Sequence, residues 1–292
     1  MNIIGLFRFI VGHPLNRGAR SAAIARFATW QVGSRLLRKP VAMPFVNDTS
    51  LIMEIGMTGA TGNWYCGLLE IVEMGFVLHA MRPDDLLADV GANVGSYSVL
   101  AGGAVGASVV AVEPVPATFT RLVRNISFNG IGNKVEAHCL GLSSSVGELN
   151  FVSSLDTMNR VALPGEAGAT IKVPVTTLDL LFADRTPTFM KIDVEGYEKW
   201  VIEGGEQVLA RPGLKAILME TNQSGAKFGV SDAELISKMT QFGFTAHGYD
   251  PLFRTILERP ADAKNTIFLR NPDEIQAICR SAPRFKLVNG EI

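Results

Sequence analysis

One short turn in the sequence combines an acid with two closely spaced glycines. In the segment DVGANVG, Asp89 ends an apolar run, and Gly91 and Gly95 follow it. Asn93 stands midway between the two glycines, and a helical pattern begins at Ser96. Glycines let a backbone turn tightly and approach a ligand, and the first turn of a helix offers free N–H groups. This pattern predicts a nucleotide-like cofactor bound where a strand passes into a helix.

The charges around this turn favour one class of cofactor. A dinucleotide-binding turn has the pattern G-x-G-x-x-G, whereas this turn has G-x-x-x-G. Asp89 would repel a pyrophosphate but suits a cationic amino group, such as that of the methionine part of S-adenosylmethionine. Glu113 ends the next apolar run, where a carboxylate can accept hydrogen bonds from both ribose hydroxyls. We therefore predict S-adenosylmethionine as the cofactor; the alternative is an ordinary turn with a solvated Glu113.

A second group of polar side chains follows two later apolar runs. In FMKIDVEGYEKW, Asp193 ends a run, and Glu195 stands where the next helix is expected. Glu220 and Asn222 end the following run in AILMETN. Carboxyl ends of parallel strands meet at one edge of a sheet, so these residues are expected near the cofactor. Asp193, Glu220 and Asn222 offer oxygen ligands for Mg²⁺, which would lower the pKa of an acceptor hydroxyl.

If the methyl group of such a cofactor passes to an alcohol, the reaction also needs a group that withdraws the hydroxyl proton. Asp193 is the first candidate for this base, with Glu195 and Glu220 behind it. An acid at Glu195 equally suits the dipole of the following helix. His247, in TAHGYD, lies near the end of a later predicted strand. The pattern favours an ordinary loop histidine there, with a catalytic histidine as the alternative.

The segment GMTGATGNWYCG, which precedes these motifs, is rich in glycine and polar residues and ends in two aromatic residues. It predicts a loop that closes over a ligand. Thr61, Asn63 and Trp64 are expected acceptor contacts, as is Asn222 across the sheet edge. Tyr65 is an expected cofactor contact, together with Ser96 of the glycine turn. The alternative is a plain turn that leads into a helix over residues 68–81.

Short apolar runs alternate with helical patterns from residue 86 onward, which is typical of a sheet wound by helices. The predicted fold class is α/β: a Rossmann-like, doubly wound, seven-stranded, mostly parallel sheet with helices on both faces and an N-terminal helical appendage. The predicted strands span residues 86–90, 108–112, 135–140, 188–192, 214–219, 244–248 and 266–270. The predicted helices between them span 96–103, 117–128, 195–210 and 233–242. Two further strands, 148–152 and 171–175, flank a Gly/Ser/Thr-rich stretch that is interpreted as a mobile excursion.

The predicted domain organisation has three parts. Residues 1–79 form a basic helical appendage with the ligand-covering loop, residues 80–272 the cofactor-binding α/β domain, and residues 273–292 a C-terminal helix and tail. The 292-residue chain has a net charge of −1, yet its first 47 residues hold seven basic residues and no acid. The helix expected over residues 17–37 either docks on the domain with its arginines in solvent or contacts a membrane surface or an acidic partner.

Composition narrows the cellular setting. No apolar run reaches the roughly 18 residues that a transmembrane helix needs, and the N-terminus fits a signal peptide poorly. Three cysteines without close spacing favour a reducing compartment and exclude a zinc cluster of CxxC pairs. We therefore predict a cytoplasmic protein with possible membrane association. Because the chain beyond its N-terminal segment is net acidic and has no aromatic–basic platform, we expect no nucleic-acid binding.

Several segments together resemble the FkbM-type methyltransferases, a class I S-adenosylmethionine-dependent family. They are FVNDTSLIMEIGMTGATGNWY, DVGANVGSYSVLA, VVAVEPVPATFTRLVRNISFNG, VPVTTLDLL and MKIDVEGYEKWVIEGG, between about residues 45 and 270. The resemblance implies methyl transfer to oxygen, often a hydroxyl of a sugar or polyketide-type product. The cofactor contacts that it implies are Asp89, Gly91, Asn93, Gly95 and Glu113, and it places Asp193 at the active site.

The preferred hypothesis is an O-methyltransferase that acts on a small molecule, glycan or glycolipid. One rival is a nicotinamide-dependent oxidoreductase on the same kind of sheet, which the missing third glycine disfavours. Another is a non-catalytic scaffold that retains the fold, which the acids at successive strand ends disfavour. The oligomeric state is left open by the sequence.

Overall fold

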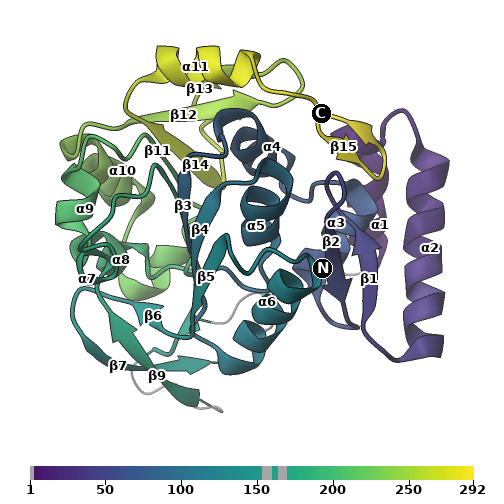
Figure 1. Cartoon of the computed structure of the whole chain (residues 1–292), viewed down its shortest axis with the longest axis horizontal. Helices are drawn as coiled ribbons and strands as arrows, with labels where there is room; N and C mark the ends of the chain where they lie inside the picture. Colours follow the sequence, from purple (N-terminus) through teal and green to yellow (C-terminus); the bar gives the residue numbers. More distant parts are fainter. Residues whose placement is uncertain (1–2, 153–159, 164–169) are drawn as a thin grey trace.

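A mixed β-sheet of eight strands organises the chain (Figure 1). The structure is a computed structural model that describes residues 3–152, 160–163 and 170–292. The eight strands are β3 Leu86–Val90, β4 Ser108–Val112, β5 Val135–His138, β10 Phe189–Ile192, β11 Ala216–Glu220, β12 Thr245–Asp250, β13 Thr255–Glu258 and β14 Asn265–Leu269. Their spatial order is β13-β12-β14-β11-β10-β3-β4-β5.

The topology places the functional edge between β3 and β10. The five strands β11, β10, β3, β4 and β5 run parallel, and β14 is inserted antiparallel between β11 and β12. The chain proceeds from β3 to β4 and β5 on one side, then returns to β10 and β11 on the other. Ligands of such sheets bind beyond the carboxyl ends of the strands at this reversal of order.

Alternate residues of the central strands feed two separate apolar cores. In β3, Leu87 belongs to one core and Ala88 to the other, as the period of two in a strand requires. The first core is covered by α4 Ile71–Ala80, α5 Ser96–Val99 with its π-helical continuation η2 Leu100–Val105, α6 Pro116–Phe128 and α11 Pro272–Arg280. The second is covered by α7 Leu178–Leu181, α8 Glu198–Glu203, α9 Glu206–Ala210 and α10 Asp232–Gln241. Helices on both faces make the sheet doubly wound.

The N-terminal segment packs on the first of these cores. It comprises α1 Ile3–Gly12, the 3₁₀ helix η1 Pro14–Asn16, α2 Arg20–Leu37, the hairpin β1 Val41–Pro44 and β2 Ser50–Met53, and α3 Thr58–Cys66. Ile10 and Trp30 share an apolar cluster with Leu87 of the sheet and Ile275 of α11. This cluster includes residues on both sides of the predicted domain boundaries at residues 79 and 272. The boundaries themselves stay a prediction.

Two smaller sheets complete the described structure. One has the order β6-β9-β7-β8 and is built from β6 Gly141–Leu142, β7 Gly147–Val152, β8 Arg160–Val161 and β9 Thr170–Thr176. The other pairs β15 Lys286–Leu287 with β16 Gly290–Glu291. Most of the predicted excursion after residue 152 lies outside the described residues. None of the described helices is long and apolar enough to cross a bilayer.

The predicted fold class is confirmed, with corrections to its elements. The sheet has eight strands instead of seven, because β13 was missed: its residues are half-buried or exposed and show no alternating burial. The predicted helix over residues 195–210 is two helices and begins three residues later. Gly204 and Gly205 lie between the two helices, and a Cβ on Gly204 would lie 2.1 Å from the carbonyl oxygen of Ser143. The arginines of α2 were expected in solvent, but Arg26 is buried and its Nη2 donates to Asn16 Oδ1 at 2.9 Å.

Candidate active site

A cavity of about 540 Å³ opens at the carboxyl ends of the parallel strands. Its wall comes from the turns after β3 and β10, the ends of β4 and β11, α3, and the facing parts of α1 and α2. This volume lies in the range of small-molecule and cofactor sites. Members of both groups predicted from the sequence therefore meet in one cavity.

The turn after β3 adopts left-handed backbone conformations. Gly91, Asn93 and Gly95 have φ angles of 80°, 51° and 90°. A Cβ on Gly91 would lie 1.9 Å from the carbonyl oxygen of Asp193, so only glycine fits between the two turns. The Gly91 N–H also donates to the carbonyl oxygen of Val112 at 3.0 Å. Backbone contacts to the strands on either side therefore fix this turn.

Glu113, at the end of β4, faces the cavity with its carboxylate held by the backbone. Its Oε2 accepts from the Asn93 N–H at 2.9 Å, and its Oε1 from the Val115 N–H at 3.0 Å. Burial raises the pKa of Glu113 to about 7, against the lowering effect of these two hydrogen bonds. Each carboxylate oxygen can accept a further hydrogen bond. The carboxylate is thus oriented and still able to accept from a pair of hydroxyls.

Two predicted cofactor contacts do not line the described cavity wall. Asp89 is fully buried, and its Oδ2 accepts from the Ser98 hydroxyl at 2.6 Å. Its Oδ1 has no hydrogen-bond partner among the described residues. Gly95 packs against Leu122, where a Cβ would lie 2.6 Å from Cδ1. Asp89 and Gly95 therefore shape the turn from behind, whereas Gly91, Asn93 and Ser96 reach the cavity.

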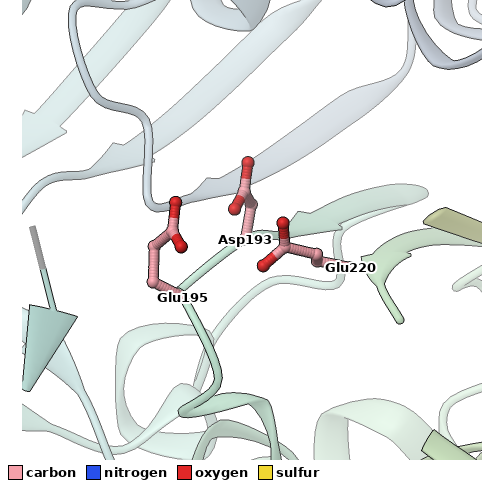
Figure 2. A group of neighbouring side chains, drawn as sticks. All are labelled: Asp193, Glu195 and Glu220. Carbon is pink, nitrogen blue, oxygen red and sulfur yellow. The ribbon is translucent and has the colours of Figure 1, made fainter. Parts of the chain in front are cut away.

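Three carboxylates converge on the other side of the cavity (Figure 2). Asp193, Glu195 and Glu220 each place one oxygen within 4.8 Å of the others, with Asp193 between the two glutamates. Burial, and then the charge of Asp193, raise the pKa of Glu195 to about 7. Burial and then Asp193 also raise the pKa of Glu220. The three acids therefore do not all ionise readily at neutral pH.

The detailed contacts distinguish these acids. Glu195 has a φ of 55°, an uncommon left-handed conformation for a non-glycine residue. Glu220 Oε1 accepts from the Asn222 side-chain amide at 2.6 Å, while its Oε2 has no hydrogen-bond partner among the described residues. Asn222 is absent from the described cavity wall, so it supports Glu220 from behind. The compact cluster of acids that could ligate a metal thus contains Glu195 beside the predicted Asp193 and Glu220.

Lys191 and Glu70 were missed by sequence reasoning. Lys191 Nζ lies 2.8 Å from Asp193 Oδ2 and 4.8 Å from the centre of the Tyr97 ring. Burial alone would lower its pKa, but the charges of Asp193, Asp89 and Glu70 raise it. Tyr97 donates its hydroxyl to Glu70 Oε2 at 2.6 Å, and burial raises the pKa of Glu70 to about 7. Lys191 had a signal, a lysine within an apolar strand two residues before Asp193; Glu70, before α4, had none.

The predicted ligand-covering loop is instead the helix α3. Its glycines serve close packing, since a Cβ on Gly62 would lie 2.6 Å from Leu69 Cδ1. The helix nevertheless brings Thr61, Asn63 and Tyr65 to the cavity wall. Trp64 is not among the described wall residues, and its indole N–H donates to the Arg26 carbonyl at 3.3 Å.

His247 lies on β12, away from the described cavity wall. Its Nε2 is 2.8 Å from the Thr245 hydroxyl, and it pairs across the sheet with Glu258 of β13. The structure therefore does not bring the predicted catalytic histidine to the acids. Its hydrogen bond agrees with the interpretation as an ordinary histidine.

The sequence from the cofactor turn to β12 matches a known family. The model of the methyltransferase FkbM domain covers residues 89–250. The chain belongs to the FkbM methyltransferase family. It is similar to the hexuronic acid methyltransferase AglP of Haloferax volcanii, with 34% identity over 131 residues. That alignment covers 44% of this chain and 53% of the relative, so the chain spans about half the length of the curated relative it matches.

Two solved structures are similar to this FkbM methyltransferase chain. It is similar to the FkbM methyltransferase of Methylobacillus flagellatus KT, with a TM-score of 0.46, 13% identity, and coverage of 72% of this chain and 53% of that chain. TrmK of M. capricolum, solved with S-adenosylhomocysteine, is similar with a TM-score of 0.40, 8% identity, and coverage of 68% of each chain.

Proposed function

We propose that this FkbM methyltransferase uses S-adenosylmethionine to methylate a hydroxyl of a glycan, glycolipid or related small molecule. The observation that carries the proposal is one cavity with a backbone-oriented carboxylate, Glu113, on one side and the converging acids on the other. The name of the relative AglP, a hexuronic acid methyltransferase, supports a sugar acceptor.

The residues on the cofactor side fit S-adenosylmethionine, which supplies an electrophilic methyl group when bound. Glu113 has acceptor capacity left for the two ribose hydroxyls, and Gly91 lets the backbone approach the ligand. Ser96 and Asn63 add polar groups at the same wall, with Asn63 Nδ2 3.4 Å from Ser96 Oγ. The acids of this wall suit the cationic sulfonium and ammonium groups of the cofactor.

The acids on the acceptor side divide into two roles. Lys191 stabilises the charge of Asp193, which accepts a hydrogen bond from the acceptor hydroxyl and positions it. Glu220 takes the proton through its Oε2, which has no hydrogen-bond partner in the described part of the chain. The raised pKa of Glu220 brings it closer to the neutral range in which a general base is most effective. Glu195 lies beside both and is the second candidate for the base.

This assignment makes the reaction independent of a divalent metal. The ammonium of Lys191 already supplies a positive charge at Asp193, where the predicted Mg²⁺ would bind. We expect turnover to be unchanged after dialysis against EDTA. Loss of turnover that Mg²⁺ restores would instead assign the three carboxylates to a metal.

Mass spectrometry of glycans and glycolipids from a deletion strain tests the function. We expect a species lighter by one methyl group to accumulate, and wild-type protein to restore its methylation. The Asp193→Asn variant should not restore it. An unchanged glycan profile, or full restoration by that variant, would contradict the proposal.

A further inference from the structure

Exposed apolar side chains gather on the two N-terminal helices. On α2, Val32 is 60% exposed and Leu36 is 78% exposed. The exposed large apolar residues of α1 and α2 are Ile4, Phe7, Phe9, Ile24, Val32, Leu36 and Leu37. Single exposed apolar residues are ordinary, but a contiguous group marks an interaction surface.

The exposed residues of α2 form one stripe. Ile24, Val32 and Leu36 are exposed and, together with the exposed Ala28, recur every four residues, which places them on one side of the helix. The opposite side carries the buried Trp30 and packs toward the rest of the molecule. Figure 1 shows α2 as the outermost helix at its edge of the molecule.

Basic residues surround this apolar stripe. No acid precedes Asp48 in the sequence. The exposed basic side chains of the same segment are Arg8, Arg17, Arg20, Arg35, Arg38 and Lys39. An exposed apolar stripe bordered by arginines is the pattern of a helix that lies in the interface of an anionic bilayer. The charge complements anionic lipid headgroups, and the apolar side chains suit the acyl boundary beneath them.

The same two helices border the cavity. Leu6 and Phe9 of α1, and Gln31 and Arg35 of α2, belong to its wall. Phe9 and Arg35 are also exposed, so the cavity wall reaches the basic–apolar surface. A molecule held in a bilayer beneath α1 and α2 would therefore meet the cavity that contains Asp193.

We propose that α1 and α2 lie on an anionic membrane surface and that the acceptor is a glycan carried on a membrane lipid. The second half rests on the proposed methyltransferase function, whereas the first half does not. The bilayer would present the glycan at the rim formed by Phe9 and Arg35, with its hydroxyl directed toward the three acids.

Vesicle co-sedimentation of the full chain tests the surface. We expect binding to vesicles of phosphatidylcholine mixed with phosphatidylglycerol, and weak binding to phosphatidylcholine alone. The Arg17→Gln/Arg20→Gln variant should bind roughly 30-fold more weakly, at roughly fivefold per charge removed. The Val32→Ser/Leu36→Ser variant should bind these vesicles about tenfold more weakly, or weaker still. Phe253→Ser, which changes a 79% exposed residue outside this surface, is the matched control and should bind like wild type.

Three outcomes would overturn the proposal. The first is that the wild type does not bind to anionic vesicles, and the second is that all variants bind equally. The third is that the wild type forms a dimer which the Val32→Ser/Leu36→Ser substitutions dissociate; this result would assign the surface to a second copy of the chain. Calorimetry with S-adenosylmethionine on each variant separates a failure of membrane binding from a failure of the proposed function. The unmethylated species of the deletion strain should extract into organic solvent with the lipids; a water-soluble species would refute the lipid-borne acceptor.

Discussion

The two sides of the cavity hold their carboxylates in opposite ways. Glu113 on the β4 side accepts one backbone hydrogen bond at each oxygen, so its orientation is fixed. On the β10 and β11 side, three carboxylates face one another, and Glu220 Oε2 has no hydrogen-bond partner among the described residues. The first arrangement suits binding without chemical change. The second raises the pKa values of Glu195 and Glu220 toward the neutral range, which suits proton transfer.

Two glycines allow close backbone contacts between the turns that carry the two sides of the cavity. Gly91 lets the turn after β3 touch the carbonyl of Asp193, and Gly196 lets the turn after β10 touch the carbonyl of Ser224. A Cβ would lie 1.9 Å and 2.4 Å from these oxygens, respectively. The positions of the binding and reacting groups are therefore coupled through backbone contacts. The comparison predicts that changes on the acid side alter turnover, whereas changes at the junction alter folding.

The largest expected effect is on turnover in Asp193→Asn. The substitution removes the charge between the two glutamates, which positions the hydroxyl and raises the pKa of Glu220. We expect turnover to fall by about 10²–10⁴-fold, the usual contribution of positioned acid–base groups. Binding of S-adenosylmethionine, measured by calorimetry, should stay near normal. Normal turnover, or loss of cofactor binding to the same degree, would remove the distinction between the two sides.

Gly91→Ala should destabilise the fold at the junction. Its Cβ would overlap the Asp193 carbonyl, so we expect the free energy of unfolding to fall by about 3–5 kcal/mol. Gly106→Ala is the matched control. Its φ of 84° is similar, but no atom lies within 4 Å of its Cβ, so only the strain of about 1–2 kcal/mol applies. Equal losses in urea unfolding would show that the two turns do not constrain each other.

A smaller effect is expected from pH on stability. Burial raises the pKa of Glu70 from 4.5 to about 7, so the folded state holds this proton more tightly than the unfolded state. The free energy of unfolding should therefore decrease as pH rises from about 4.5 to about 7. Glu70→Gln should make this decrease smaller by about 2 kcal/mol in urea unfolding at a series of pH values. An unchanged slope in the variant would contradict the assignment of a buried, proton-holding Glu70.

Much of the fold follows from local patterns. The runs that form β3, β4 and β10 are buried on both faces, so they stand out as apolar segments between helical patterns. The missed features depend on distant contacts. The helical pattern of the sequence continues across the break at Gly204, and the Ser143 carbonyl that approaches this glycine belongs to another part of the chain.

The site residues likewise divide into those that local sequence patterns predict and those that depend on distant contacts. Glu113 and Asp193 were predictable because each ends a parallel strand, and such ends share one edge of the sheet. Asp89 was assigned to the cofactor on the same ground, but its side chain turns toward Ser98 of α5 instead. Lys191 could have been recognised as a lysine within an apolar strand two residues before Asp193. Its partner Glu70 depends on the connection before α4, which one sequence does not reveal.

Calorimetric titration with S-adenosylmethionine and, separately, with NAD tests the proposed function most directly. We expect wild-type protein to bind S-adenosylmethionine at one site and not to bind NAD. Glu113→Gln should weaken binding about tenfold to a hundredfold, since it removes charge-assisted hydrogen bonds to the ribose. Binding of NAD alone, binding of neither ligand, or equal affinity in Glu113→Gln would contradict the proposed function.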